Sequence, residues 1–223
     1  MLYLFNEENG EISYIYYESN VISPDKQKEI FDWLESMDDF KSGHIYGQEI
    51  SRLQKWYQSE NQYFSKEWIK EYDRWKSHDY CDKLTSYQSL IQDITTDICR
   101  KNKIKIPKIN SCLINKYKTG DNIIKKHSDN QTTFGDNPTV SILSIGQTRT
   151  MYFTRRKHNP CNIRYFELDE DTKHLNMSIK LEPGSILIMG GATQKYFCHS
   201  IEKEETLNTR YSITCREYFN LID

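Results

Sequence analysis

The stretch that decides the fold is SCLINKYKTGDNIIKKHSD, residues 111–129. It holds two runs of strand-forming composition, 111–117 and 123–128, and Thr119-Gly120-Asp121 supplies turn chemistry between them. These features predict two short β-strands joined by a tight connection. The second run leads into His127-Ser128-Asp129, so the same stretch also carries candidate metal ligands.

The same texture continues toward the end of the sequence. Six more runs have strand composition, and turn residues such as Glu182-Pro183-Gly184 separate several of them: 140–145, 151–154, 177–181, 185–189, 196–200 and 210–217. Eight short strands within about 110 residues are typical of a double-sheet barrel or jelly roll. The polar segment 155–173 is predicted to be a loop insertion between strands.

Two helices are predicted before this region. Ser23-Pro24 provides a cap and a first-turn proline, and Ile30, Phe31 and Leu34 follow at helical spacing. The second helix, 85–100, has an apolar face of Tyr87, Leu90, Ile91, Ile94 and Ile98. We therefore expect an α+β, mainly β fold: a double-stranded β-helix (jelly roll) with N-terminal helices packed on it. The extension would cover 1–108 and the core 109–223, within one structural domain overall.

Composition limits the class of protein. The chain has 223 residues, of which 37% are hydrophobic and 28% charged, and no run of about 18 apolar residues could cross a membrane. The first residues meet acid at once, unlike a signal peptide, and the six cysteines form no C-x-x-C pair. We expect an intracellular, monomeric protein with reduced thiols and no membrane association.

Charge is distributed unevenly along the chain. Residues 1–99 contain 10 Lys and Arg against 19 Asp and Glu, whereas residues 100–158 contain 13 against 3. The basic part also holds the H-x-D triplet, which a polyanionic substrate near the site would explain. A solvated surface that balances the acidic first part explains the charges equally well.

Two histidines and a carboxylate can bind one face of an Fe(II) ion and leave positions open for a co-substrate and O₂. On a strand, His127 and Asp129 project to the same side, and Ser128 points away. The third ligand must come from another strand. His199 lies on a predicted strand, while the other histidines flank the polar segment or lie in the N-terminal part. His127, Asp129 and His199 are therefore the candidate metal ligands.

The last predicted strand has two possible orientations. Its even-numbered face from 210 to 216 would read Arg, Ser, Thr, Arg, and burying two unpaired arginines is costly. A bound dicarboxylate together with Asp129 would compensate both charges. By alternation alone, the better expectation is an outward basic face, with Tyr211, Ile213 and Cys215 inside.

In its motifs the chain resembles the AlkB family of Fe(II)/2-oxoglutarate-dependent dioxygenases. The family's ordered pattern is Asn-x-Tyr, H-x-D, a distal His and Arg-x-Asn-x-Thr-x-Arg. The matching residues here are Asn115-Lys116-Tyr117, His127-Ser128-Asp129, His199 and the segment 210–216, so the resemblance covers about residues 109–217. Upstream, the segment 52–57 is similar to the family's nucleotide-recognition lid, and Phe64-Ser65 resembles the aromatic-Ser pair that follows it.

The resemblance implies a role for each matched position. His127, Asp129 and His199 would bind Fe(II). Arg210 would hold the distal carboxylate of 2-oxoglutarate, and Arg216 would lie near the other carboxylate and orient Asp129. The remaining co-substrate and substrate residues would be Asn115, Tyr117 and Ser212 around 2-oxoglutarate, and Arg52, Trp56, Tyr57 and Gln131 around the substrate.

The implied reaction is oxidative demethylation of N-alkylated bases in DNA or RNA, with release of formaldehyde, succinate and CO₂. A base must be flipped or single-stranded to reach such a site, and Trp56 and Tyr57 would provide stacking surfaces. Equally, they could form an aromatic cluster that only covers the barrel. The sequence departs from the family at Gln131, where an acid is usual, and at Ser212, where Asn is usual.

Two other functions stay open. A dioxygenase with the same iron site could hydroxylate or demethylate protein or peptide side chains. A jelly-roll binding module without catalysis is the third hypothesis, although it would need neither the metal ligands nor both arginines.

Overall fold

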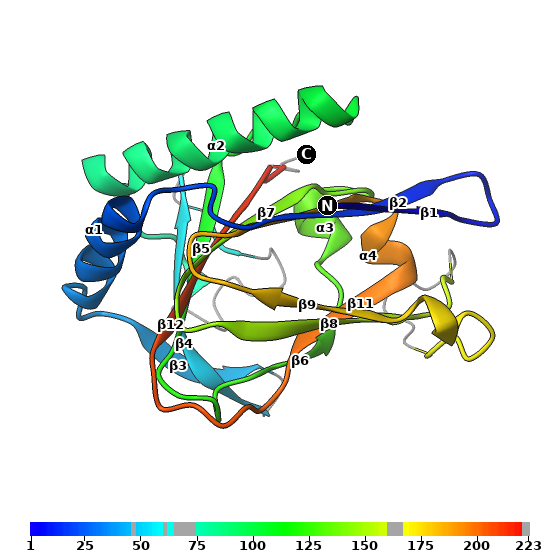
Figure 1. Ribbon diagram of the computed structural model, residues 1–223. Coiled ribbons are helices and arrows are strands. Elements are labelled where there is room, and N and C mark those ends of the chain that lie inside the picture. Colours follow the sequence, from blue (N-terminus) through cyan, green and yellow to red (C-terminus); the bar gives the residue numbers. More distant parts are fainter. Residues whose placement is uncertain (46–47, 60–61, 65–74, 160–166, 220–223) are drawn as a thin grey trace.

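The computed structural model describes residues 1–45, 48–59, 62–64, 75–159 and 167–219. Two antiparallel sheets lie face to face, with two long helices covering the outer face of the larger one (Figure 1). The predicted fold class is therefore confirmed.

The larger sheet contains eight strands. Their spatial order is β1 (Leu2–Asn6), β2 (Ile12–Glu18), β10 (Ile186–Gly191), β7 (Val140–Gly146), β12 (Arg210–Arg216), β5 (Ser111–Tyr117), β4 (Gln48–Gln58) and β3 (Lys41–Ile45). The last strand in the chain, β12, lies in the middle of the sheet, between β7 and β5. Its residues therefore have neighbours on both sides.

The smaller sheet has four strands in the order β6 (Ile124–His127), β11 (Phe197–Ile201), β8 (Arg149–Arg155) and β9 (Met177–Leu181). Apolar side chains from both sheets form one core between them, including Val140 and Leu187 from the larger sheet and Phe153 and Ile201 from the smaller. This interior also holds the polar residues of the site.

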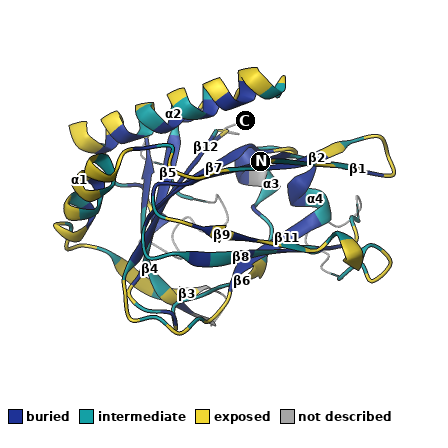
Figure 2. Ribbon diagram, in the orientation of Figure 1, coloured by how far each residue is buried: buried dark blue, intermediate teal, exposed yellow. Residues whose placement is uncertain are grey.

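The second core lies between the larger sheet and the helices α1 (Pro24–Glu35) and α2 (Asp82–Asn102). At the start of α1 the Lys26 backbone N–H donates to Ser23 Oγ (3.2 Å), as the Ser23-Pro24 cap predicts. Ile30 and Leu34 are fully buried, and the opposite faces of both helices are exposed (Figure 2). Two short helices, α3 (Gln131–Phe134) and α4 (Thr193–Tyr196), and the 3₁₀ turn Lys173–Leu175 complete the described elements.

All eight predicted strands are present, with boundaries shifted by a few residues, but four N-terminal strands were not predicted. β2 pairs with β10 and β4 pairs with β5, so the N-terminal segment contributes strands on both sides of the core strands. β8 runs to Arg155, the first residue of the predicted loop insertion. Residues 160–166 of that insertion lie outside the described residues.

Two further expectations concern cysteines and membranes. Five cysteines fall within the described ranges, all of them free, while Cys161 lies outside them. Among the described helices, none is both long and apolar enough to cross a bilayer.

Candidate active site

His127, Asp129 and His199 come together at one end of the smaller sheet. His127 on β6 and His199 on β11 are direct cross-strand partners, with their ring centroids 4.3 Å apart. Asp129 follows β6 by two residues, and His127 Nε2 lies 3.9 Å from its Oδ1. One ligand atom from each of the three lies within 4.8 Å of the others, which is close enough for one ion to contact all three.

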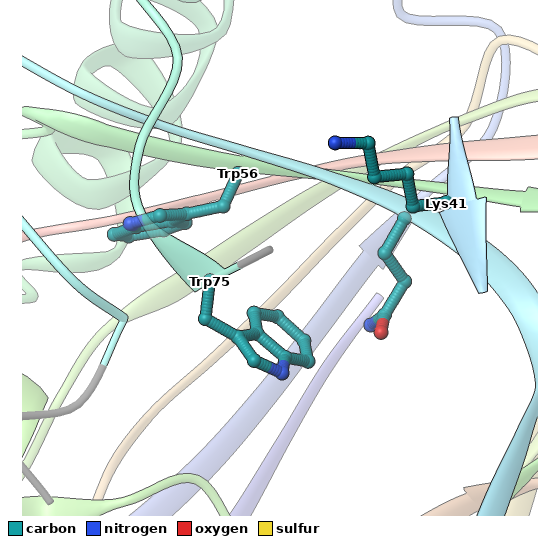
Figure 3. A pocket seen from close by; sticks show the side chains of 4 residues that line it. Lys41, Trp56 and Trp75 are labelled. Atoms are coloured by element: carbon teal, nitrogen blue, oxygen red, sulfur yellow. The ribbon is translucent and has the colours of Figure 1, made fainter. Parts of the chain in front are cut away.

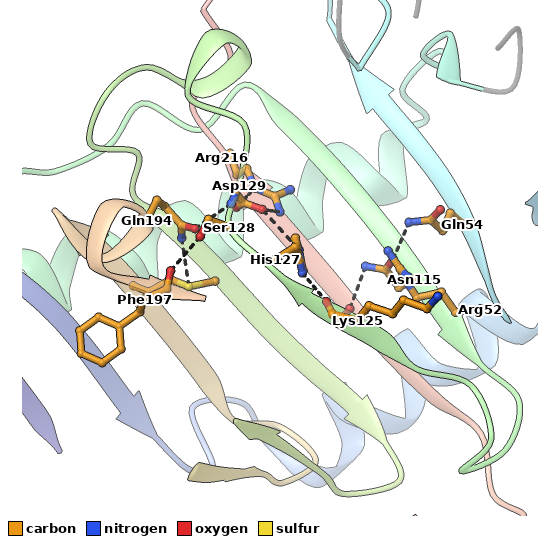
Figure 4. Close-up of polar contacts among 12 residues, drawn as sticks. Arg52, Gln54, Asn115, Lys125, His127, Ser128, Asp129, Gln194, Phe197 and Arg216 are labelled. Atoms are coloured by element: carbon orange, nitrogen blue, oxygen red, sulfur yellow. Dashed lines mark hydrogen bonds and ion pairs between the residues drawn. The ribbon is translucent and has the colours of Figure 1, made fainter. Parts of the chain in front are cut away.

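Neighbouring groups hold the ligands in place. His127 Nδ1 lies 2.9 Å from the carbonyl oxygen of Lys125, which leaves Nε2 available to a metal. Arg216 grips Asp129 with two hydrogen bonds: Nε donates to Oδ2 (2.8 Å) and Nη2 donates to Oδ1 (3.2 Å). The expected contact between Arg216 and Asp129 is therefore present (Figure 4).

The protonation of these groups follows from their surroundings. Burial raises the pKa of Asp129, but the charges of Arg216 and the two histidines outweigh it and lower the value to about 2. Burial and the neighbouring His127 lower the pKa of His199 to about 3. Burial also lowers the pKa of His127. At neutral pH the set is one carboxylate and two neutral imidazoles, which is the form that binds a metal.

Residues outside the H-x-D triplet hold it in place through hydrogen bonds to Ser128 and Asp129. Ser128 Oγ donates to the carbonyl of Phe197 (2.8 Å), and Arg156 Nη1 donates to Ser128 Oγ (3.0 Å). The Asp129 N–H donates to Oε1 of Gln194 in α4 (2.8 Å). These bonds tie the triplet to β11, the strand that carries His199, and so set the distance between the ligands.

Arg210 lies at the other end of β12 from Arg216, with 1% of its surface exposed. Its Nη2 donates to Ser144 Oγ (3.1 Å), and its guanidinium lies 5.0 Å from the ring centre of Tyr117. Within the described part of the chain, Nε and Nη1 of Arg210 have no hydrogen-bond partner. Two buried, unpartnered N–H groups on one guanidinium suit a carboxylate that binds with both oxygens.

Asn115 and Ser212 lie opposite each other on β5 and β12. Asn115 Nδ2 donates to Ser212 Oγ (3.2 Å), and its Oδ1 accepts from Nε of Arg52 and Nε2 of Gln54, both at 3.0 Å. These bonds fix both ends of the Asn115 amide. With Tyr117 they form a polar row along the interior face, beside Arg210.

Both implied groups fit these residues. Two imidazoles and one carboxylate on one side of an ion suit Fe(II) with open positions. The unpartnered N–H groups of Arg210 suit a carboxylate of 2-oxoglutarate, and the Asn115–Ser212–Tyr117 row supplies polar contacts beside it. Arg210, Ser212 and Arg216 share one face of β12, so both sites open into the same interior.

The expectation of an outward basic face on β12 is wrong. Arg210, Ser212, Thr214 and Arg216 face the interior between the sheets, while the odd-numbered residues pack under the helices. Both faces of β12 are buried, so alternation alone could not identify the inward one. Asp129 compensates Arg216, which is why that charge can lie inside.

The predicted lid segment 52–57 is part of β4 and pairs with β5. Arg52 Nε donates to Asn115 Oδ1 (3.0 Å), and Nη1 donates to the carbonyl of Ile123 (3.3 Å), so this side chain joins β4 to β5 and to the residue before β6. Ser65, which belongs to the aromatic-Ser pair, lies outside the described residues.

Trp56 and Tyr57 lie on opposite faces of β4. Trp56 is 1% exposed and packs with Phe64, Trp75, Phe134 and Tyr218, whereas Tyr57 is 3% exposed and packs under the helices. Tyr57 therefore faces the helices, away from the interior that holds His127, Asp129 and His199, and the structure does not bring this predicted stacking residue to the site.

On the face with Trp56 there is a small hollow lined by Lys41, Gln54, Trp56 and Trp75 (Figure 3). The Trp56 cluster also adjoins the iron ligands, since Arg216 lies 4.8 Å from the ring centre of Phe134. Gln131 begins α3, two residues after Asp129, and is half-buried.

Sequence reasoning missed three residues that support the site. Ser144 binds Arg210, Gln194 binds the backbone of Asp129, and Arg149 is a buried cation beside Tyr117. None belongs to a motif with metal or carboxylate spacing. Only the position of Ser144 in a run of buried strand residues could have indicated an inward polar group.

Residues 14–216 match the family described as the 2OG-Fe(II) oxygenase superfamily. The chain belongs to that superfamily. This family is named for 2-oxoglutarate and Fe(II), the two groups that Arg210 and the His127–Asp129–His199 set fit. The match includes β2 and β4 as well as the jelly-roll core, so it covers the N-terminal strands that complete the larger sheet.

The similarity to curated relatives covers about half of this chain. The alpha-ketoglutarate-dependent dioxygenase alkB homolog 3 of Mus musculus is 34% identical over 111 residues, which is 49% of this chain and 37% of the mouse protein. The DNA oxidative demethylase ALKBH2 of Arabidopsis thaliana is 27% identical over 121 residues, 49% of this chain and 38% of the plant protein. The matches therefore span well under half the length of these relatives.

Solved structures resemble nearly the whole chain at lower identity. OsALKBH1 has a TM-score of 0.61 and 15% identity, covering 96% of this chain and 99% of its own. A prolyl hydroxylase from Trichoplax adhaerens, solved with a peptide fragment, has a TM-score of 0.57 and 12% identity, covering 92% and 83%. These likenesses show the fold that this superfamily member shares with both.

Proposed function

We propose that this protein is an Fe(II)/2-oxoglutarate-dependent dioxygenase that oxidatively demethylates N-alkylated bases in DNA or RNA. The observation that carries the proposal is the pairing of two sites in one interior. His127, Asp129 and His199 lie within reach of one ion, and Arg210 offers two buried N–H groups to a carboxylate.

When bound, Fe(II) with 2-oxoglutarate and O₂ supplies the oxidising power to hydroxylate an N-methyl group, whose product breaks down to formaldehyde and the amine. The residues of the chain bind, orient and exclude water. Arg216 holds the Asp129 carboxylate in one rotamer, and Lys125 fixes the His127 ring. The apolar core between the sheets keeps bulk water from this interior.

A nucleic acid is the substrate class that the sequence relatives favour, since their names describe AlkB homologues and a DNA demethylase. The β3–β4 hairpin beside the site carries Arg52 and Trp56, and α3 places Gln131 near Asp129. We propose these three as substrate residues. Exposed Lys125 and Lys126 precede the iron ligands and suit phosphate contact. We expect the protein to act inside the cell, as a monomer.

The decisive assay supplies Fe(II), ascorbate and 2-oxoglutarate with a single-stranded oligonucleotide that contains 1-methyladenine. Mass spectrometry follows both succinate and the mass of the base. We expect succinate together with loss of the methyl group, and neither with the His127→Ala variant. Succinate without methyl loss from DNA or RNA would contradict the substrate class, and no succinate from iron-loaded protein would contradict the enzyme itself.

The alternative is a dioxygenase of protein or peptide side chains with the same iron site. It shares the fold with the prolyl hydroxylase neighbours, but at 12% identity or less that likeness says nothing about substrate. Binding of a single-stranded oligonucleotide that weakens steeply with salt would favour the nucleic acid, because phosphate contacts release counterions. Binding that is insensitive to salt would favour the peptide.

A further inference from the structure

Arg149, the first residue of β8, is a buried cation that no motif includes. It is 1% exposed, and its Nη groups donate to four backbone carbonyls: those of Thr119 (3.3 Å), Gly120 (3.2 Å), Asn122 (3.0 Å) and Glu202 (2.5 Å). The Glu204 carboxylate lies 3.7 Å from Nε and provides a counter-charge. One side chain thus joins two loops that are about 80 residues apart in the sequence.

These two loops connect the co-substrate strands to the iron strands. Residues 118–123 lead from β5, with Asn115 and Tyr117, to β6, with His127. Residues 202–209 lead from β11, with His199, to β12, with Arg210. The packing of these two loops against each other therefore connects the strands of the proposed carboxylate site to those of the proposed metal site.

The loops are closely packed where Arg149 holds them. The Gly120 N–H donates to the Thr206 carbonyl (2.8 Å), and the Glu204 N–H donates to the Gly120 carbonyl (3.2 Å). A Cβ at position 120 would lie 1.6 Å from the Glu204 carbonyl oxygen, so only glycine fits there. We call this contact between residues 118–123 and 202–209 the loop junction. Its close packing leaves little freedom, and the hydrogen bonds of Arg149 stabilise it from the interior side.

Arg149 also reaches the co-substrate arginine through an aromatic ring. Its guanidinium lies 5.6 Å from the ring centre of Tyr117, and the guanidinium of Arg210 lies 5.0 Å from the same centre. Cations over an aromatic ring are attracted to it. Tyr117 thus contacts both buried cations and links the position of Arg210 to that of Arg149.

We propose that Arg149 is the positioning residue for 2-oxoglutarate, acting through the loop junction and Tyr117 to hold Arg210 in register with the iron ligands. This inference rests on the proposed function, because it assigns a role toward that function's co-substrate. In this proposal Arg210 binds the carboxylate, and Arg149 acts on it only through Tyr117 and the two loops. It fixes where the carboxylate is bound relative to the metal.

Arg155, at the opposite end of the same strand, provides a matched control. It is also buried, and its Nη1 donates to both carboxylate oxygens of Glu7 (3.0 and 2.9 Å). Glu7 follows β1, at the far edge of the larger sheet. Removing either arginine disrupts a buried polar network, but only Arg149 lies at the junction.

The test measures binding without turnover, with Mn(II) in place of Fe(II). Titration calorimetry gives the 2-oxoglutarate affinity of the Mn(II) protein, and electron paramagnetic resonance gives the Mn(II) affinity without 2-oxoglutarate. We expect Arg149→Met to weaken 2-oxoglutarate binding about tenfold, as loss of an outer positioning partner does, with Mn(II) affinity changed less than about twofold. Arg155→Met should lower the thermal midpoint and leave both affinities near wild type.

A folded Arg149→Met variant with wild-type 2-oxoglutarate affinity would overturn the inference, as would an equal loss of both affinities. If that variant does not fold, Arg149→Lys decides. Lysine keeps the charge but has three donors and no planar group, so we expect about threefold weaker 2-oxoglutarate binding. Wild-type affinity in Arg149→Lys would overturn the proposal. If the wild-type protein binds Mn(II) but no 2-oxoglutarate, the proposed function fails first.

Discussion

Both ends of β12 carry a buried arginine, but among the described residues only one of the two is paired with a carboxylate. Arg216 and Arg210 are both buried and face the same interior, six residues apart. Arg216 binds the Asp129 carboxylate with two hydrogen bonds, whereas Arg210 has one hydrogen bond, to Ser144, and two unpartnered N–H groups within the described residues.

The charge of Arg216 is balanced within the folded protein, whereas under the proposed function the charge of Arg210 is fully balanced only when 2-oxoglutarate is bound. A buried charge is costly unless it is paired, so Arg216 is compensated by folding itself. Arg210 is compensated only in part, by Ser144 and the Tyr117 ring, and its burial lowers its pKa. Under the proposed function, a carboxylate of 2-oxoglutarate would supply the remaining compensation.

We expect the largest effect from removing the Asp129 carboxylate, which pairs with Arg216. Asp129→Ala leaves Arg216 as a buried, unpaired cation and removes a metal ligand. We expect loss of Mn(II) binding and of turnover, and a free energy of unfolding lower by about 3 kcal/mol, measured by urea denaturation. The double variant Asp129→Ala/Arg216→Met should recover much of that stability, and a double variant less stable than Asp129→Ala would contradict the pairing.

Replacing each arginine with methionine should change stability in opposite directions. Arg216→Met leaves Asp129 unpaired and should destabilise the protein, whereas Arg210→Met removes an incompletely paired charge and should leave stability equal or higher. 2-Oxoglutarate at about 100 times its Kd should stabilise the wild type by about 2.7 kcal/mol and Arg210→Met not at all. Thermal unfolding with and without the co-substrate measures both. A strong loss of stability in Arg210→Met without ligand would count against the contrast.

At low pH, protonation of Asp129 should leave Arg216 without a charged partner, as Arg210 already is in the part of the chain that the structure describes. Arg216 and the histidines lower the folded pKa of Asp129 to about 2, against an ordinary value of 3.8. The unfolded chain therefore takes up the proton first, so the stability from the pair is present above pH 3.8 and is lost as pH falls toward 2. The loss should be about 2 kcal/mol.

The measurement is the free energy of unfolding of the metal-free protein, by urea denaturation between pH 6 and pH 2. The advantage of the wild type over Asp129→Asn should shrink through the lower part of this range. A difference that stays constant down to pH 2 would show that Asp129 does not titrate in the pair.

The smallest expected effect lies midway between the two arginines. Ser212→Ala removes the acceptor for Asn115 Nδ2, a bond worth about 1 kcal/mol, and should weaken 2-oxoglutarate binding by no more than about fivefold. The Arg216–Asp129 pair, and with it Mn(II) affinity, should be unchanged. A parallel loss of Mn(II) affinity would show that the two ends of β12 are not independent.

The sequence predicted the jelly-roll strands and the three residues that the structure brings within reach of one ion, because both depend on local patterns. His127 and Asp129 are two residues apart on a strand, and His199 was the remaining histidine on a predicted strand. The N-terminal strands could not be predicted in the same way. β2 has buried neighbours in sequence, such as Tyr14 and Ile15, so its alternation is weak, and its partner β10 is about 170 residues away.

The orientation of β12 and the role of Tyr57 depended on which face of a strand meets which layer. Ile213 faces the helices and Ser212 faces the interior, yet both are buried. Alternation of polar and apolar residues identifies a solvent face, and the larger sheet has none at its centre. Arg149 was missed for a related reason: its partners are backbone carbonyls, which no side-chain pattern reveals.

The central place of β12 also sets the order in which the chain can fold during synthesis. The ribosome releases β5 and β7 long before β12, although each needs β12 as its neighbour in the sheet. Until residues 210–216 emerge, the larger sheet has an open gap at its middle, with unpaired strand edges on both sides. Nascent chains at that stage should need a chaperone, and chains that terminate before residue 210 should be degraded instead of accumulating as partly active enzyme.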